Sequence, residues 1–140
     1  MKDGKFFLDT NILLYTFDKT APAKQSVAIH LVEEALLGKG CISFQVMQEF
    51  LNTALRKFEP PMTAEQAQHY QQTTLNWLCD YYPGEDFYRR GLGIKERWRF
   101  SWYDSLIITA ALECGCHTLY SEDLQHQQKI ETLTIINPFS

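Results

Sequence analysis

The 140-residue sequence lacks several features that would place it in a broad class of proteins at once. No apolar run approaches the roughly 18 residues that a membrane-spanning helix needs, and the N-terminus has no signal-peptide hydrophobic region followed by a cleavage site of small residues. There is also no internal repeat, low-complexity segment or linker-like stretch. We therefore expect a single domain over residues 1–140, with no membrane segment and a cytoplasmic location.

Motifs for zinc and for nucleotide cofactors are also missing. The one close cysteine pair, Cys114 and Cys116, is separated by a single residue rather than by the two of common metal sites, so we expect the four cysteines to be free thiols in apolar surroundings. The four histidines show no ligand spacing with the cysteines. Gly91-Leu92-Gly93 follows no expected strand and lacks the third glycine of a dinucleotide-binding turn.

The sequence has no excess of positive charge, which nucleic-acid-binding proteins usually show. Its formal net charge is −4, from 17 acidic residues and 13 Lys or Arg residues. If four of the acids belong to a metal site, the remaining thirteen balance the basic residues, and a bound dication reverses the local field. The composition therefore permits RNA binding but does not predict it.

Short apolar runs alternate with helical patterns along the chain, which is typical of a parallel α/β fold with right-handed crossovers and three layers. Proline, glycine and capping residues mark the ends of the helices. The expected strands are 6–8, 40–43, 79–82, 117–120 and 134–136. The expected helices are 12–17, 22–38, 44–59, 64–78, 85–99 and 102–115. We expect 85–99 to be irregular because Gly91 and Gly93 interrupt it.

Four acidic residues occupy matched positions in this pattern. Asp9 and Asp123 each follow an apolar strand directly, so both leave the carboxyl edge of the sheet if those strands are neighbours. Glu49 and Asp104 are expected in the opening turns of helices that begin at the same edge. Without a Lys or Arg beside them in sequence, four carboxylates repel one another unless a cation lies between them. Oxygen ligands select hard ions such as Mg²⁺ or Mn²⁺.

Each acid also has a structural interpretation, which is the stronger one for any acid taken alone. Asp9 and Asp123 can cap helices, and Glu49 can be a solvated charge on a helix. Asp104 can be the third position of a capping box that begins at Ser101, although it stands on a helix face that we expect to be buried. Four acids at matched strand and helix positions favour a shared site.

Four motifs in this order resemble the PIN-domain ribonucleases, and among them the VapC-like toxins of type II toxin–antitoxin pairs. The resemblance covers essentially the whole chain, and it is carried by the order and spacing of the motifs together. The motifs are Leu8-Asp9-Thr10-Asn11, Gln48-Glu49-Phe50, Tyr103-Asp104-Ser105-Leu106-Ile107 followed by Ala110-Ala111, and Leu119-Tyr120-Ser121-Glu122-Asp123-Leu124.

The resemblance implies a sheet in the order 3-2-1-4-5 and endonucleolytic cleavage of RNA with Mg²⁺ or Mn²⁺. The catalytic and metal-binding residues that it implies are Asp9, Glu49, Asp104 and Asp123, with Thr10, Asn11 and Ser121 as polar supports. The family often has Thr where this chain has Ser121, a change that keeps the hydroxyl. Many members have a further acid in place of Gln125, so the resemblance extends to the primary cluster and leaves the number of metal ions open.

A segment rich in arginine and aromatic residues precedes Asp104 and is a candidate for contacts with the RNA backbone and for base stacking. A solvated helix face explains it equally well, and Trp102 can also belong to the core. The candidate RNA-binding residues are Arg89, Arg90, Arg97, Arg99 and Trp102, with Lys95 and Trp98 between them.

The resemblance also implies a small antitoxin partner, whose segment occupies the acidic groove, and a homodimer. Two alternatives stay open: a catalytically inactive PIN-like module that binds RNA or protein, and a housekeeping RNA-processing nuclease. A receiver-like phosphoacceptor domain is disfavoured, because it requires an acidic pair at the first strand and a basic residue after the last one.

Overall fold

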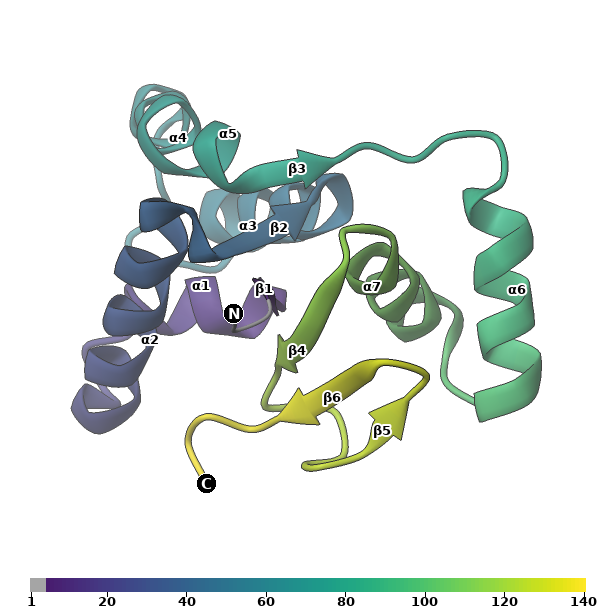
Figure 1. The fold of residues 1–140 in the computed structure, drawn as a ribbon. Coiled ribbons are helices and arrows are strands. Elements are labelled where there is room, and N and C mark those ends of the chain that lie inside the picture. Colours follow the sequence, from purple (N-terminus) through teal and green to yellow (C-terminus); the bar gives the residue numbers. More distant parts are fainter. Residues whose placement is uncertain (1–4) are drawn as a thin grey trace.

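The computed structural model describes residues 5–140, so the first four residues of the expected domain lie outside its described part. Within residues 5–140 the chain forms one six-stranded sheet in the order β3-β2-β1-β4-β6-β5 (Figure 1). All neighbouring strands are parallel except β5 and β6. The strands are β1 (Lys5–Leu8), β2 (Gly40–Ser43), β3 (Cys79–Tyr81), β4 (Cys116–Tyr120), β5 (Lys129–Ile130) and β6 (Leu133–Ile136).

The sheet confirms the expected fold class and contains one further strand. The five expected strands correspond to β1, β2, β3, β4 and β6, and they take the expected order. The sequence did not predict the two-residue strand β5 at one edge, where Lys129 of β5 pairs antiparallel with Thr134 of β6. A strand of two residues is too short to show a period of two in the sequence.

Helices flank the sheet on both sides. In Figure 1, α1 and α2 lie to the left of the strands, α7 lies to the right, and α6 lies beyond α7. The helices are α1 (Thr10–Tyr15), α2 (Pro22–Glu34), α3 (Phe44–Arg56), α4 (Ala64–Tyr70), α5 (Asn76–Leu78), α6 (Phe87–Trp98) and α7 (Trp102–Glu113), with π-helical segments η1 (Ala35–Lys39) and η2 (Gln71–Leu75). No helix within residues 5–140 is long and apolar enough to cross a membrane.

Local capping explains where the site-bearing helices begin. The Ser43 hydroxyl accepts a hydrogen bond from the backbone N–H of Val46 at the start of α3. The Ser101 hydroxyl accepts one from the N–H of Asp104 at the start of α7. Such side chains satisfy N–H groups that the first helical turn leaves without a partner. The caps therefore fix the first residues of α3 and α7.

Helix α6 is continuous, so the expectation of an irregular helix over 85–99 was wrong. Gly91 is buried within it, and a Cβ atom there would lie 2.8 Å from the Leu106 side chain of α7. The glycine thus lets the two helices approach closely, which offsets its low helix propensity. Tertiary packing, rather than local preference, holds this helix together.

The core lies on both faces of the central strands. Phe7 and Leu8 of β1 are fully buried, and so is Leu119 of β4. Helix α7 is buried at every position from Ser105 to Ala111, as its apolar sequence predicts. Since β1 and β4 are neighbours, with Leu8 opposite Tyr120, the segments that follow the two strands leave the sheet side by side.

Candidate active site

Asp9 is the first residue after β1 and lies at the centre of this edge. Its Oδ1 accepts a hydrogen bond from the N–H of Thr10 over 2.7 Å, so it caps α1. Its Oδ2 accepts a hydrogen bond from the Ser121 hydroxyl, which follows β4, over 2.8 Å. The helix-cap interpretation of Asp9 is therefore correct, and the same carboxylate also joins two strand ends.

The environment of Asp9 is unfavourable for a negative charge, because only 7% of the residue is exposed. Burial raises the pKa of its carboxyl to about 6. The hydrogen bonds from Ser121 and Thr10 oppose this shift, and the nearby carboxylates of Glu49 and Asp123 add to it. A cation beside Asp9 would stabilise its ionised form.

Glu49 reaches the same region from α3. It lies in the second turn of α3, which begins at Phe44 as predicted. Glu49 Oε1 accepts a hydrogen bond from the Thr10 hydroxyl over 2.5 Å. Its Oε2 accepts one from Gln45 Nε2 over 3.0 Å. Both carboxylate oxygens of this half-buried residue are therefore positioned.

Asp123 belongs to a loop that Asn11 fixes in place. Asn11 donates from Nδ2 to Asp123 Oδ2 over 3.1 Å, and its Oδ1 accepts from the N–H of Glu122 over 3.2 Å. Ser121 is fully buried, and its hydroxyl accepts from the N–H of Asp123. No helix follows Asp123, so the helix-cap interpretation of this residue was wrong. The side chain of Asp123 is exposed.

Asp104 lies in the first turn of α7 and is half-buried, so the expectation of a fully buried face was wrong at this residue. Its N–H donates to Ser101, but among residues 5–140 no hydrogen bond or ion pair reaches its carboxylate. The reciprocal bond of a capping box is not formed there. Asp104 thus presents a carboxylate with no protein partner in the described chain.

One cavity of about 380 Å³ brings the four acids together. Thr10 and Asn11 also line it, whereas Ser121 lies behind Asp9. Of the described residues that line the cavity, none is Lys or Arg. Its acidic lining consists of Asp9, Glu49, Asp104 and Asp123. We refer to this space as the acidic cavity.

The donor atoms of the acidic cavity suit a hard divalent ion, because all its charged groups are carboxylates. Within the described chain, however, no three His, Cys, Asp or Glu side chains converge closely enough to hold a metal ion. Hydrogen bonds direct Glu49 toward Thr10 and Asp123 toward Asn11. Metal binding would therefore require side-chain rotations, which the exposed Asp123 and the partner-free Asp104 permit.

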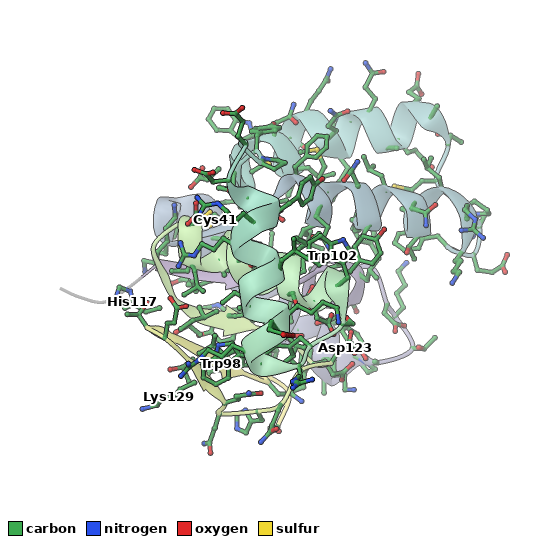
Figure 2. The ribbon with its side chains drawn as sticks, turned by 90° about the vertical axis from the view of Figure 1, so that its right-hand side faces the viewer. Cys41, Trp98, Trp102, His117, Asp123 and Lys129 are labelled. Carbon is green, nitrogen blue, oxygen red and sulfur yellow. The ribbon has the colours of Figure 1, made fainter. Side chains whose placement is uncertain are left out.

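Three arginines of the arginine-rich segment, Arg89, Arg90 and Arg97, each contact another side chain. Arg90 forms ion pairs with Glu113 and, over 3.2 Å, with Glu131. Arg89 pairs with Asp86 on the surface, and the Arg97 guanidinium lies 5.2 Å from the Trp98 ring centroid. Trp102 is half-buried against the core. Figure 2 shows Trp102 and Asp123 on the same side of α6. The role of the arginines and of Trp102 in RNA binding stays a prediction.

Sequence reasoning missed two residues that organise this edge. Gln45 contacts both Glu49 and, through Nε2, the backbone oxygen of Tyr103 over 3.2 Å. Its spacing of four residues from Glu49 on one helix was the signal for the first contact. Glu122 accepts hydrogen bonds from Tyr15 and Lys24, over 2.6 and 2.5 Å. No local signal joins Glu122 to Lys24.

A comparison with protein families matches the chain to the PIN domain over residues 6–131. The chain belongs to the PIN domain family. No curated protein matches the sequence.

Solved structures share this PIN fold at low sequence identity. A toxin–antitoxin complex from Klebsiella pneumoniae has a TM-score of 0.68 at 18% identity, covering 96% of this chain and 98% of that one. VapBC-1 from nontypeable Haemophilus influenzae has a TM-score of 0.64 at 19% identity, with coverage of 96% and 98%. VapBC2 from Rickettsia felis, bound to a DNA fragment from the promoter, has a TM-score of 0.63 at 17% identity, with coverage of 93% and 96%. At these identities the likeness shows the fold.

Proposed function

We propose that this PIN-domain protein is a metal-dependent endoribonuclease that hydrolyses RNA phosphodiester bonds. The observation that supports this most directly is the acidic cavity, where four carboxylates line one space without a described Lys or Arg. They come from the residue after β1, from α3, from α7 and from the segment after β4. Such an arrangement is costly unless a cation compensates it. Cleavage of a polyanion at an acidic site likewise needs a cation to offset the repulsion.

Mg²⁺ or Mn²⁺ would be held by Asp9, Asp104, Asp123 and Glu49. The chemistry that the ion supplies when bound is a hydroxide nucleophile and stabilisation of the charge on the phosphate and the leaving oxygen. Asp9 is held in position, because Thr10 and Ser121 each donate a hydrogen bond to one of its two carboxylate oxygens. Asp104 is the free member, since its carboxylate has no partner in the described chain.

The three polar supports, Thr10, Asn11 and Ser121, hold the carboxylates in position. The Thr10 hydroxyl orients Glu49, and the Asn11 side chain orients Asp123 and the backbone of Glu122. Ser121 connects the loop to Asp9. These three residues contact carboxylates rather than the reacting phosphate, so we assign them a positioning role.

We further propose that the protein is the toxin of a toxin–antitoxin pair, acting in the cytoplasm as a homodimer with a small antitoxin as its partner. The support is the fold shared with the Klebsiella, Rickettsia and Haemophilus structures, each of them a complex of a toxin–antitoxin system. A housekeeping nuclease would share the chemistry but not the partner. Expression of this protein in bacteria should therefore arrest their growth. Co-expression of a small antitoxin encoded beside it should relieve the arrest.

The test of the nuclease is cleavage of structured and single-stranded RNAs by the wild type in Mg²⁺, Mn²⁺ or EDTA. We expect cutting in the two metals, none in EDTA, and none with the Asp9→Asn or Asp104→Asn proteins. Glu33→Gln, at an exposed carboxylate of α2, is the matched control and should cut normally. Absence of cutting by metal-loaded wild type would favour the inactive binding module instead.

A further inference from the structure

A second cavity, of about 200 Å³, lies beside the acidic cavity and differs from it in chemistry. Its lining comes from the start of α3, from β3 and from α6 and α7. None of the described residues that line it is charged. Half of its lining residues are aromatic, namely Phe44, Tyr81, Phe87, Tyr88 and Tyr103. We refer to it as the aromatic pocket.

Two tyrosines of this pocket present large ring surfaces to solvent. Tyr103 is 65% exposed and Tyr88 is 56% exposed. The Tyr88 ring is positioned by contacts with Phe87 and Trp102, at centroid distances of 5.6 and 6.0 Å. Tyr103, in contrast, has no ring contact or side-chain hydrogen bond within residues 5–140. Its ring contributes little to the packing of the described chain and is available to a ligand.

Gln45 joins the aromatic pocket to the acidic cavity. It lines the pocket, and its Nε2 donates both to Glu49 Oε2, over 3.0 Å, and to the backbone oxygen of Tyr103, over 3.2 Å. Tyr103 also directly precedes Asp104, which lines the acidic cavity. A ligand that extends from the aromatic pocket into the acidic cavity would therefore pass from Tyr103 to the adjacent residue, Asp104.

The size and charge of the pocket restrict its occupant. A volume of about 200 Å³ lies below the roughly 300 Å³ at which pockets for drug-sized molecules begin, so the pocket suits one ring system. The absence of charged lining residues in the described chain disfavours a phosphate or an ionised side chain. Gln48 lines the pocket with an exposed amide that makes no described hydrogen bond and can pair with polar edge atoms.

We propose that the aromatic pocket is a nucleobase subsite: it binds one unpaired base of the RNA whose phosphate lies at the acidic cavity, with Tyr103 stacking on that base. Aromatic rings that stack on splayed bases are the usual means of binding single-stranded RNA. This inference rests on the proposed ribonuclease function and adds its substrate class, which is RNA with an unpaired nucleotide next to the cleaved bond.

The test replaces bases near the cleavage site one at a time by an abasic ribose in a short single-stranded RNA. Binding of each RNA is measured by fluorescence anisotropy in Mg²⁺ with the Asp104→Asn protein, alone and combined with Tyr103→Ala, Tyr103→Phe or Trp77→Ala. Trp77 is 76% exposed and lies outside the pocket, so it is the matched control. The same protein variants with Asp104 intact are assayed for cleavage.

We expect one abasic position to weaken binding roughly 5- to 150-fold, the range that one stacked base contributes. Tyr103→Ala should weaken binding of the intact RNA similarly, and the abasic change should then add nothing, because both changes remove the same contact. Tyr103→Phe keeps the ring and should behave as Tyr103 does. Trp77→Ala should leave binding unchanged.

Three outcomes would overturn the subsite. The first is that the protein with Tyr103 and the Tyr103→Ala protein bind all RNAs equally well. The second is that the abasic change still weakens binding to the Tyr103→Ala protein. The third is loss of antitoxin binding or of a dimer in Tyr103→Ala with RNA binding intact, which would make the pocket a protein interface. Cleavage without base dependence would refute the subsite alone. Base-dependent binding by the Asp104→Asn protein, together with no cleavage by the wild type, would refute the nuclease alone.

Discussion

The hydroxyl of Ser121 donates a hydrogen bond to Oδ2 of Asp9 over 2.8 Å, and this bond connects the segments that follow two neighbouring strands. The two residues are 112 positions apart in the chain. Ser121 is fully buried and Asp9 nearly so, which makes the contact sensitive to the loss of either partner. It also couples the stability of the fold to the geometry of the acidic cavity.

Removal of this hydroxyl should therefore affect both stability and activity. Ser121→Ala leaves Oδ2 of Asp9 without its donor and the N–H of Asp123 without its side-chain acceptor. We expect a loss of about 1–3 kcal/mol in the free energy of unfolding and a lower rate of RNA cleavage. Urea unfolding and the cleavage assay measure the two effects. Ser121→Thr keeps the hydroxyl and should be milder, and Ser26→Ala, on the surface of α2, should change neither quantity.

Divalent metal should raise the stability of the folded protein. An ion that binds only the native state adds about 2.7 kcal/mol at one hundred times its Kd. Mg²⁺ or Mn²⁺ should therefore increase the Tm of the wild type and of Glu33→Gln. The increase should be much smaller for Asp104→Asn, although its stability in EDTA should equal that of wild type within about 0.5 kcal/mol, because the Asp104 carboxylate has no described partner. Equal shifts in all three proteins would argue against the metal site.

Arg99 should separate the structural from the RNA-binding contribution of the arginine-rich segment. It ends α6 in the left-handed region, with φ of 66°, a conformation that costs a non-glycine residue energy. Arg99→Gly should stabilise the protein by about 1 kcal/mol and yet weaken RNA binding, with a shallower dependence of affinity on salt. Arg90→Gln should instead destabilise the protein without weakening RNA binding, since Arg90 forms ion pairs with Glu113 and Glu131. Salt titrations of RNA affinity and urea unfolding distinguish the two.

The two glycines of α6 should respond differently to the same substitution. A Cβ at Gly93 meets nothing within 4 Å, so Gly93→Ala should stabilise the helix by about 0.5–1 kcal/mol. A Cβ at Gly91 would lie 2.8 Å from the buried Leu106 side chain. Gly91→Ala should therefore be less stable than Gly93→Ala by about 1–3 kcal/mol, the usual cost of overpacking. Equal stabilisation by both would show that α6 and α7 can separate freely.

The sequence by itself determined the elements of the fold and the place of the acids along the chain. Apolar runs identified five strands, and capping residues such as Ser101 marked where helices begin, because capping and periodicity act over a few residues and are visible locally. These signals put Asp9 and Asp123 directly after strands. The expected strand order came from family resemblance rather than from any local pattern.

Tertiary structure decided what the acids and their neighbours contact. It made α6 regular through the close approach of Gly91 to α7, added the short strand β5, and left the Asp104 carboxylate without a described partner. It also placed Ser121 against Asp9, and Gln45 between Glu49 and Tyr103. The Ser121–Asp9 and Gln45–Tyr103 contacts join residues that are 112 and 58 positions apart. They depend on which strands are neighbours and how closely helices pack, and no pattern within a few residues records either.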